Sequence, residues 1–148
     1  GWRGRFEFAR KIGAETVIAE SLPSDLAAIG SFCDAHDIRL AIAGDRPEPI
    51  LAACKHASPR IGACAEIQRW IRAGIDPAAA IRTLGNRLVT IASRGPSQLP
   101  EAGGRAILAT IRDANLRPAM FAFGPSAATD QIPRFDALSL DLAGGPAP

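Results

Sequence analysis

Short apolar runs alternate along this chain with longer amphipathic stretches. The runs are five or six residues long and contain few charges, the pattern typical of strands buried on both faces. They predict five strands, which cover residues 16–20, 38–43, 60–64, 88–92 and 118–123.

The stretches between these runs carry helical spacing and helix-end signals. Ser24 and Asp25 can cap one helix, and Asp76 followed by Pro77 is a strong start for another. Gly13 and Gly85 are expected helix stops. Three predicted helices have clear bounds, namely 6–13, 77–84 and a weak one over 131–142. Three more are predicted from apolar residues that share a helical face. These residues are Leu26, Ile29 and Cys33 in the first helix, Ile50, Leu51 and Cys54 in the second, and Ile107, Leu108 and Ile111 in the third.

The strands recur at intervals of roughly 20 to 30 residues, the spacing of a parallel βα repeat. Five such units can build an open, doubly wound sheet. They can equally form part of a (β/α)8 barrel, which normally needs about 250 residues. The periodicity alone does not separate these two architectures.

Composition narrows the class of protein. The chain has 148 residues, of which 47% are hydrophobic and 22% charged, values that fit one globular domain and exclude a disordered chain. A net charge of +2 is too balanced to favour a nucleic-acid partner. No apolar run reaches the roughly 20 residues that span a bilayer, so no membrane partner is expected.

Three widely spaced cysteines, Cys33, Cys54 and Cys64, argue against a disulfide framework and fit reduced, buried thiols. That chemistry favours a cytoplasmic location, although the sequence does not determine it. The two histidines form no zinc-binding spacing with the cysteines. The chain begins at Gly1 without methionine, so we expect a piece of a longer protein.

Residues 58–77 read SPRIGACAEIQRWIRAGIDP. This stretch closely resembles the segment SPRIGACADTGHWARSGLDP of sugar phosphate isomerase/epimerase domains in the xylose-isomerase-like TIM-barrel superfamily. Further similar stretches are 14–20, 38–45, 84–95 and 117–124, so the resemblance spans about 6–143. It implies a partial (β/α)8 barrel domain over 1–143, with roughly three βα units missing before Gly1. Residues 144–148 would be a flexible tail.

The resemblance also implies where a metal site would lie. Superfamily members hold a divalent metal such as Mn, Mg or Co with carboxylates and a histidine at the strand ends. The matching positions here are Ala43, Glu66, Arg69, Ala92 and Ala122, with Gly124 at a second glutamate position. Only Glu66 can still ligate, and Arg69 would repel a cation. We therefore expect no metal, no other cofactor and no metal-dependent reaction.

Three arginines follow strand ends in loops that would form the active face of a barrel. Arg46, Arg69 and Arg94 could together hold a phosphate or carboxylate without metal. The alternative is that they are solvated or paired with acidic neighbours, and a Glu66–Arg69 pair across one helical turn is its simplest form.

Other candidates each have two interpretations. Glu20 is either a catalytic base or a polar residue at a strand end, and Trp70 either stacks on a sugar ring or packs beneath the next helix. Cys64 is expected to be an inert thiol, and His36 and His56 are expected at the surface, away from the strand ends. The stretch 93–97 is only a weak match to a phosphate-binding loop.

Three functions stay open at this point. The first is a catalytically silent isomerase-like domain that serves as a scaffold or interaction module. The second is a metal-free domain that binds a sugar, sugar acid or phosphorylated ligand through its arginines. The third is an active isomerase or epimerase in which Glu20 and Glu66 act as the acid/base pair. Five units leave two sheet edges open, so we expect completion by missing units of the same chain or by self-association.

Overall fold

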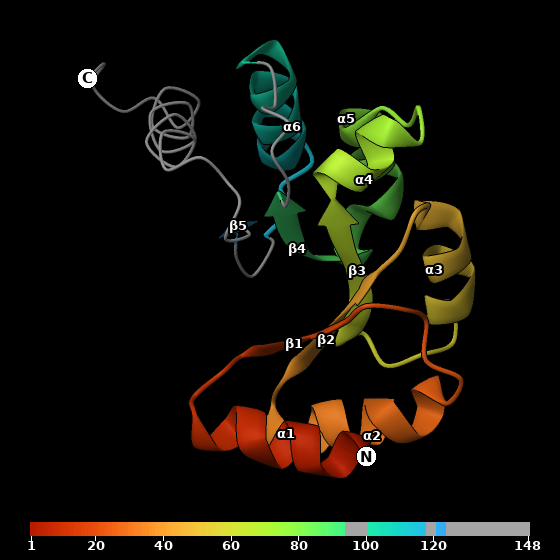
Figure 1. The fold of residues 1–148 in the computed structure, drawn as a ribbon, viewed down its shortest axis with the longest axis vertical. Coiled ribbons are helices and arrows are strands. Elements are labelled where there is room, and N and C mark those ends of the chain that lie inside the picture. The colour runs from red at the N-terminus through yellow and green to blue at the C-terminus, as the bar shows by residue number, and fades with distance from the viewer. Residues whose placement is uncertain (94–100, 118–120, 124–148) are drawn as a thin grey trace.

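The computed structural model describes residues 1–93, 101–117 and 121–123 (Figure 1). In these residues the elements follow one another as α1 (Trp2–Lys11), β1 (Thr16–Ala19), α2 (Leu26–His36), β2 (Arg39–Ala43), α3 (Pro47–Cys54), β3 (Ile61–Glu66), α4 (Ile67–Arg72), α5 (Pro77–Leu84), the 3-10 turn η1 (Gly85–Arg87), β4 (Leu88–Ser93), α6 (Glu101–Asp113) and β5 (Phe121–Phe123).

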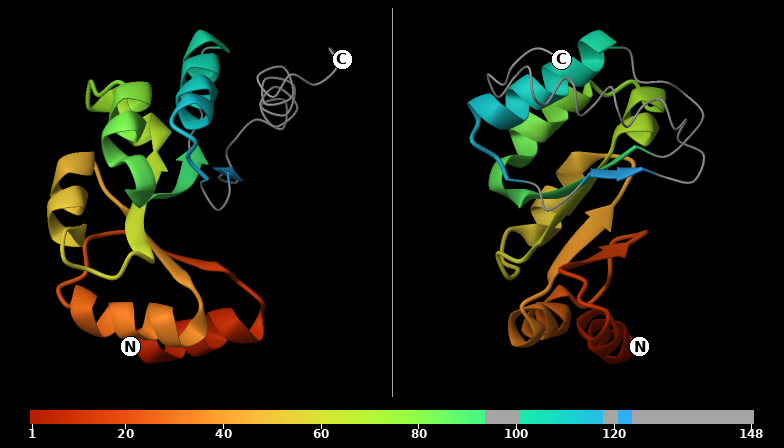
Figure 2. Two further views of the ribbon diagram at one scale, coloured as in Figure 1. Left: turned by 180° about the vertical axis from the view of Figure 1, so that it is seen from behind. Right: turned by 90° about the vertical axis from the view of Figure 1, so that its left-hand side faces the viewer.

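The five strands form one parallel sheet in the order β1-β2-β3-β4-β5. Each strand therefore pairs with the next strand of the sequence. A doubly wound sheet reverses its strand order at a switch point, and this sheet has no reversal. Figure 2 shows the sheet curving with its helices along the outer side. The architecture is thus an arc of a (β/α)8-type barrel, as the resemblance implied.

Alternate strand residues face two different surroundings. Leu40, Ile42, Ile61 and Ile91 point to the outer side and join the main core with the buried faces of the helices. The opposite, inner side carries a small cluster of buried strand residues, namely Ala41, Ala43, Cys64, Val89 and Ala92. The period-two alternation of a strand accounts for this division on β2 and β3. On β4, Val89 and Ala92 both lie in the inner cluster because the shift in register leaves Val89 as an extra residue.

The pairing of β3 with β4 shifts its register between Ala63 and Cys64. At this irregularity a Cβ on Gly62 would overlap the main-chain carbonyl oxygen of Arg87, so the position requires glycine. The Arg87 guanidinium fixes the same corner by donating hydrogen bonds of 2.8 Å to the carbonyl oxygens of Ser58 and Ile61.

The helix-start signals are confirmed. The Asp25 carboxylate accepts from the Ala28 N–H at 2.9 Å, and the Asp76 carboxylate accepts from the N–H groups of Ala78 and Ala79 at 3.3 and 3.2 Å. Gly85 follows α5 with a φ of +53°, a conformation that favours glycine.

The largest differences from the expectation are in two elements and one helix that was not predicted. Helix α1 begins at Trp2 rather than at residue 6, and β3 continues to Glu66 instead of ending at residue 64. The six-residue helix α4 was missed, because it follows β3 without a turn signal and is shorter than a helical pattern needs for detection. The expected helix over 131–142 and the tail 144–148 lie outside the described residues.

In the ranges that the structure describes, no helix is both long and apolar enough to cross a lipid bilayer.

Candidate functional site

The carboxyl ends of the strands are where a barrel places its active site. Register aligns Glu66 of β3 with Ala92 of β4, and Ala92 with Ala122 of β5. Ala43 of β2 aligns with Cys64, one inner position earlier along β3. The register thus places Glu66, Ala92 and Ala122 in one row across three strands, with Ala43 in the row before it.

Glu66 is the buried carboxylate of this region. It is the last residue of β3 and only 5% exposed. The Cys64 thiol, two residues earlier on the same face, donates to its Oε1 at 3.8 Å. Because strands flank β3 on both sides and α4 begins at the next residue, the backbone holds this side chain in a crowded, low-dielectric position.

Arg69 forms an ion pair, but the partner in the described structure is Asp45. Its Nε lies 3.5 Å from Oδ1 of Asp45, with both side chains partly or largely exposed. Pairing with an acidic neighbour was one of the two interpretations for this arginine. Arg46, the residue after Asp45, is exposed at the start of α3. Arg94 lies outside the described residues.

Trp70 lies in the core rather than at the surface of the strand ends. It is fully buried, and its indole N–H donates to the carbonyl oxygen of Gly44 at 3.0 Å. This bond joins α4 to the end of β2 and satisfies the ring's polar atom. The burial supports the packing role over stacking on a sugar. Glu20 lies directly after β1 and is exposed.

The thiols are buried, as expected. Burial raises the pKa of Cys33 to about 11 and also raises the pKa of Cys54. A thiol with a raised pKa is protonated at neutral pH and is a poor nucleophile. The His36 ring is half-buried and stacks on Phe6, with 6.4 Å between the ring centroids, whereas His56 is exposed.

The donor set at the strand ends does not fit the divalent metal that the resemblance implies. A divalent oxygen-ligated cation needs several carboxylates or carbonyls around it. Glu66 supplies one carboxylate, Ala43 and Ala92 supply methyl groups, and Arg69 brings a positive charge to the next turn. Among the described residues no group of three or more histidine, cysteine, aspartate and glutamate side chains could hold a metal ion.

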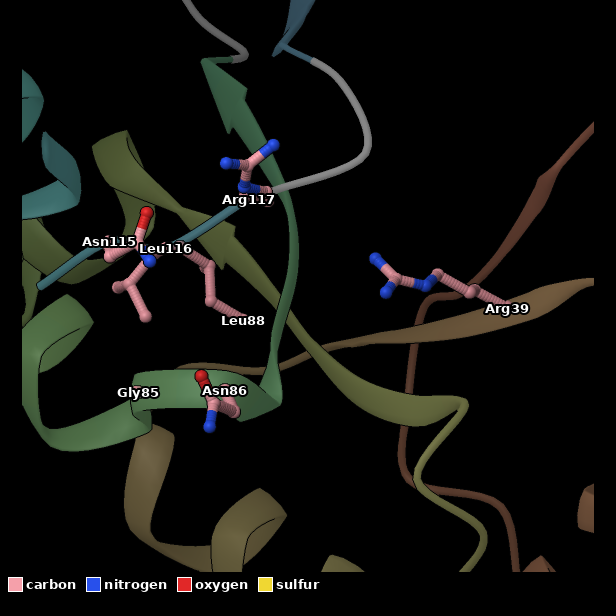
Figure 3. Close-up of a pocket in the computed structure, with 7 residues that line it drawn as sticks. All are labelled: Arg39, Gly85, Asn86, Leu88, Asn115, Leu116 and Arg117. Atoms are coloured by element: carbon pink, nitrogen blue, oxygen red, sulfur yellow. The ribbon is translucent and has the colours of Figure 1, made fainter.

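A cavity of about 260 Å³ lies at the opposite, amino-terminal ends of the strands (Figure 3). None of its residues was expected to form a site, because they come from three distant segments. The sequence signal that could have grouped them is that they stand at the starts of predicted strands or shortly before them. The lining consists of Arg39, Gly85, Asn86, Leu88, Asn115, Leu116 and Arg117.

Comparison with solved structures identifies the fold. The chain is similar to an uncharacterized protein from Parabacteroides distasonis ATCC 8503, with a TM-score of 0.70 and 24% identity over 96% of this chain and 62% of that one. It is also similar to a sugar phosphate isomerase/epimerase from the same organism, with a TM-score of 0.60 and 12% identity over 96% and 60% of the two chains. A further sugar phosphate isomerase/epimerase from that organism matches with a TM-score of 0.59 and 9% identity, over 97% of this chain and 62% of that one.

These likenesses confirm that the chain has the barrel-type fold of sugar phosphate isomerase/epimerase structures. The chain spans about three fifths of the length of these structures. No family model matches the sequence, and no curated protein matches it.

Proposed function

We propose that this chain is the carboxyl-terminal part of an isomerase-like barrel that has lost metal-dependent sugar chemistry and acts as a non-catalytic scaffold or interaction domain. One observation carries the proposal. The strand-end rows that would hold the ligands contain Ala43 and Ala92 beside the single carboxylate of Glu66. A metal that polarises a substrate carbonyl needs a complete ligand set, and methyl groups cannot supply it.

The partner in this proposal is whatever completes the barrel. Among the described strands, β1 pairs only with β2 and β5 only with β4, so the sheet has two edges. Edge strands with open hydrogen-bonding groups readily pair with further strands. The chain's coverage of three fifths of its structural neighbours supports completion by further βα units, either in the same polypeptide or from a second copy.

Metal titration tests the loss of chemistry. We expect no stoichiometric binding of Mn²⁺, Co²⁺ or Mg²⁺ to this chain in calorimetry. Glu66→Gln removes the carboxylate that is buried at the strand ends among the described residues, and Glu48→Gln removes an exposed carboxylate of α3 as a charge-matched control. Tight one-to-one binding that Glu66→Gln abolishes and Glu48→Gln preserves would overturn the proposal and favour an active enzyme using Glu20 and Glu66.

A metal-free binding function is the second candidate, and the place of Arg46 directly after Asp45, the partner of Arg69, supports it. The ion pair itself agrees with the other interpretation of Arg69, which is pairing with an acidic neighbour. That pair joins the loop after β2 to α4, which brings Arg46 and Arg69 to one corner of the molecule. Two guanidinium groups at one corner suit a phosphorylated sugar or a sugar acid. Arg94 would be a third member by sequence.

A thermal-shift series with sugar phosphates and aldonic acids separates this candidate from a purely structural domain. A ligand that binds the folded state raises its melting temperature. If the arginine corner binds, Arg46→Ala, Arg69→Ala and Arg94→Ala each reduce the shift, whereas Arg3→Ala on exposed α1 leaves it unchanged. The absence of any shift would leave the scaffold function as the better supported one.

A further inference from the structure

The cavity at the amino-terminal ends of the strands is rich in hydrogen-bond donors and positive charge. Arg39 begins β2, Asn86 lies on η1 before β4, and Asn115 and Arg117 lie between α6 and β5. In Figure 3 the Arg39 side chain extends from β2 toward the group formed by the other lining residues. Parallel strands that start at one edge of a sheet thus gather four polar side chains from distant parts of the sequence.

The side chains that line this cavity carry positive charge and no negative charge. Its lining includes two arginines and no aspartate or glutamate. Arg60, Arg69 and Arg112 form ion pairs with aspartates, and neither Arg39 nor Arg117 belongs to these pairs. Both arginines are exposed to solvent, which screens their mutual repulsion, and an anion between them would be attracted by both.

We propose that this cavity binds a small phosphate-type dianion, either free phosphate or a small phosphate monoester. Guanidinium groups bind phosphate oxygens through paired, charge-assisted hydrogen bonds, and the amide groups of Asn86 and Asn115 supply further donors. Leu88 and Leu116 form an apolar wall suited to the carbon part of an ester. A volume of about 260 Å³ is near the lower limit of ligand pockets, so the occupant is smaller than a nucleotide.

This site is separate from the candidate site at the carboxyl ends of the strands. Arg39 and Glu66 lie at opposite ends of neighbouring strands, and the proposal does not depend on the state of the metal positions. An anion here would contact the starts of β2 and β4 and the segment before β5. Its binding would therefore stabilise the packing of these three segments against one another.

Calorimetric titration with inorganic phosphate at constant ionic strength tests the proposal, with succinate as a dicarboxylate comparison. The variants Arg39→Gln, Arg117→Gln and Asn86→Asp each lower the formal charge by one, as does the control Arg3→Gln on exposed α1. We expect one phosphate per chain, an affinity loss of roughly tenfold in each cavity variant, and no change in Arg3→Gln.

Three results would overturn the inference: no saturable phosphate binding, equal weakening in Arg3→Gln, or succinate binding as tight as phosphate. The Asn86→Asp variant still tests the proposal if an arginine variant misfolds, because it replaces one exposed amide group by a carboxylate of the same size. Circular dichroism melting of each variant establishes that the folded state is being compared.

Discussion

The two faces of the curved sheet are built from different residues. The outer face carries large aliphatic side chains such as Leu40, Ile42 and Ile61, all packed against helices. The inner face carries small ones such as Ala41, Ala43 and Ala92. Closed barrels of this type usually fill the inner face with bulky branched residues, so the inner face is the unusual one.

The two faces have different roles, because the outer face supplies most of the folding stability and the inner strand ends form the candidate site. Burial of each large outer side chain is worth about 1.5 to 3 kcal/mol, so the outer face and its helices dominate the stability of the arc. The inner rows at the strand ends contain methyl groups where a metal enzyme needs ligands. The outer packing that specifies the fold therefore does not depend on which side chains stand at the inner strand ends.

The largest expected effect is that of Trp70→Ala on the outer side. The change removes a fully buried ring and leaves the Gly44 carbonyl without its 3.0 Å donor. We expect a loss of about 3 to 5 kcal/mol in the free energy of unfolding, measured by urea denaturation. Trp70→Phe keeps most of the volume and is expected to lose less. A loss below about 1 kcal/mol would contradict the outer face as the main source of stability.

Gly62→Ala is expected to have the next largest effect, and it tests the junction of β3 with β4. The added methyl group would overlap the Arg87 carbonyl oxygen, which is backbone and cannot move aside cheaply. We expect a loss of about 3 kcal/mol, measured by thermal and urea unfolding. Gly4→Ala on exposed α1 meets nothing and is the matched control, with an expected gain of about 0.5 to 1 kcal/mol. Tolerance of Gly62→Ala would refute the close approach.

Alkaline pH should weaken the outer packing through Cys33. The thiol ionises near pH 9 in the unfolded chain, whereas burial raises its folded-state pKa to about 11. The folded state holds the proton more tightly, so its stability is intact below pH 9 and falls between about 9 and 11, by at most about 1.4 kcal/mol per pH unit. Urea midpoints of the wild type and Cys33→Ala across this interval test it. An equal decline in both proteins would assign the effect to other groups.

The smallest effect is expected on the inner face. Ala43→Gly removes one methyl group from an inner strand position and adds backbone freedom, which together cost about 1 kcal/mol. Leu40→Ala, three residues earlier on the outer face of the same strand, should cost about 2 to 5 kcal/mol. Urea denaturation of both variants measures the two losses in the free energy of unfolding, and hence their ratio. Equal losses would mean that the two faces contribute alike.

Much of the fold could be predicted because its signals are local. Asp25 and Asp76 cap helices through contacts within three residues, and these starts are confirmed. Helix α4 was missed because six residues after a buried strand give no separate periodicity. The position of Glu66 at a strand end was anticipated through the family resemblance, but its 3.8 Å contact with Cys64 depends on side-chain positions that no pattern encodes.

By itself the sequence determined the alternation of strands and helices, the buried thiols, and the alanines that stand at expected ligand positions. Only the tertiary structure decided between an open doubly wound sheet and a barrel arc, since strand order depends on hydrogen bonds between segments 20 or more residues apart. Tertiary structure also paired Arg69 with Asp45 and gathered Arg39 and Arg117 around one cavity. Hydrophobic periodicity specifies which side of an element is buried, whereas the neighbours of a side chain depend on how whole elements pack.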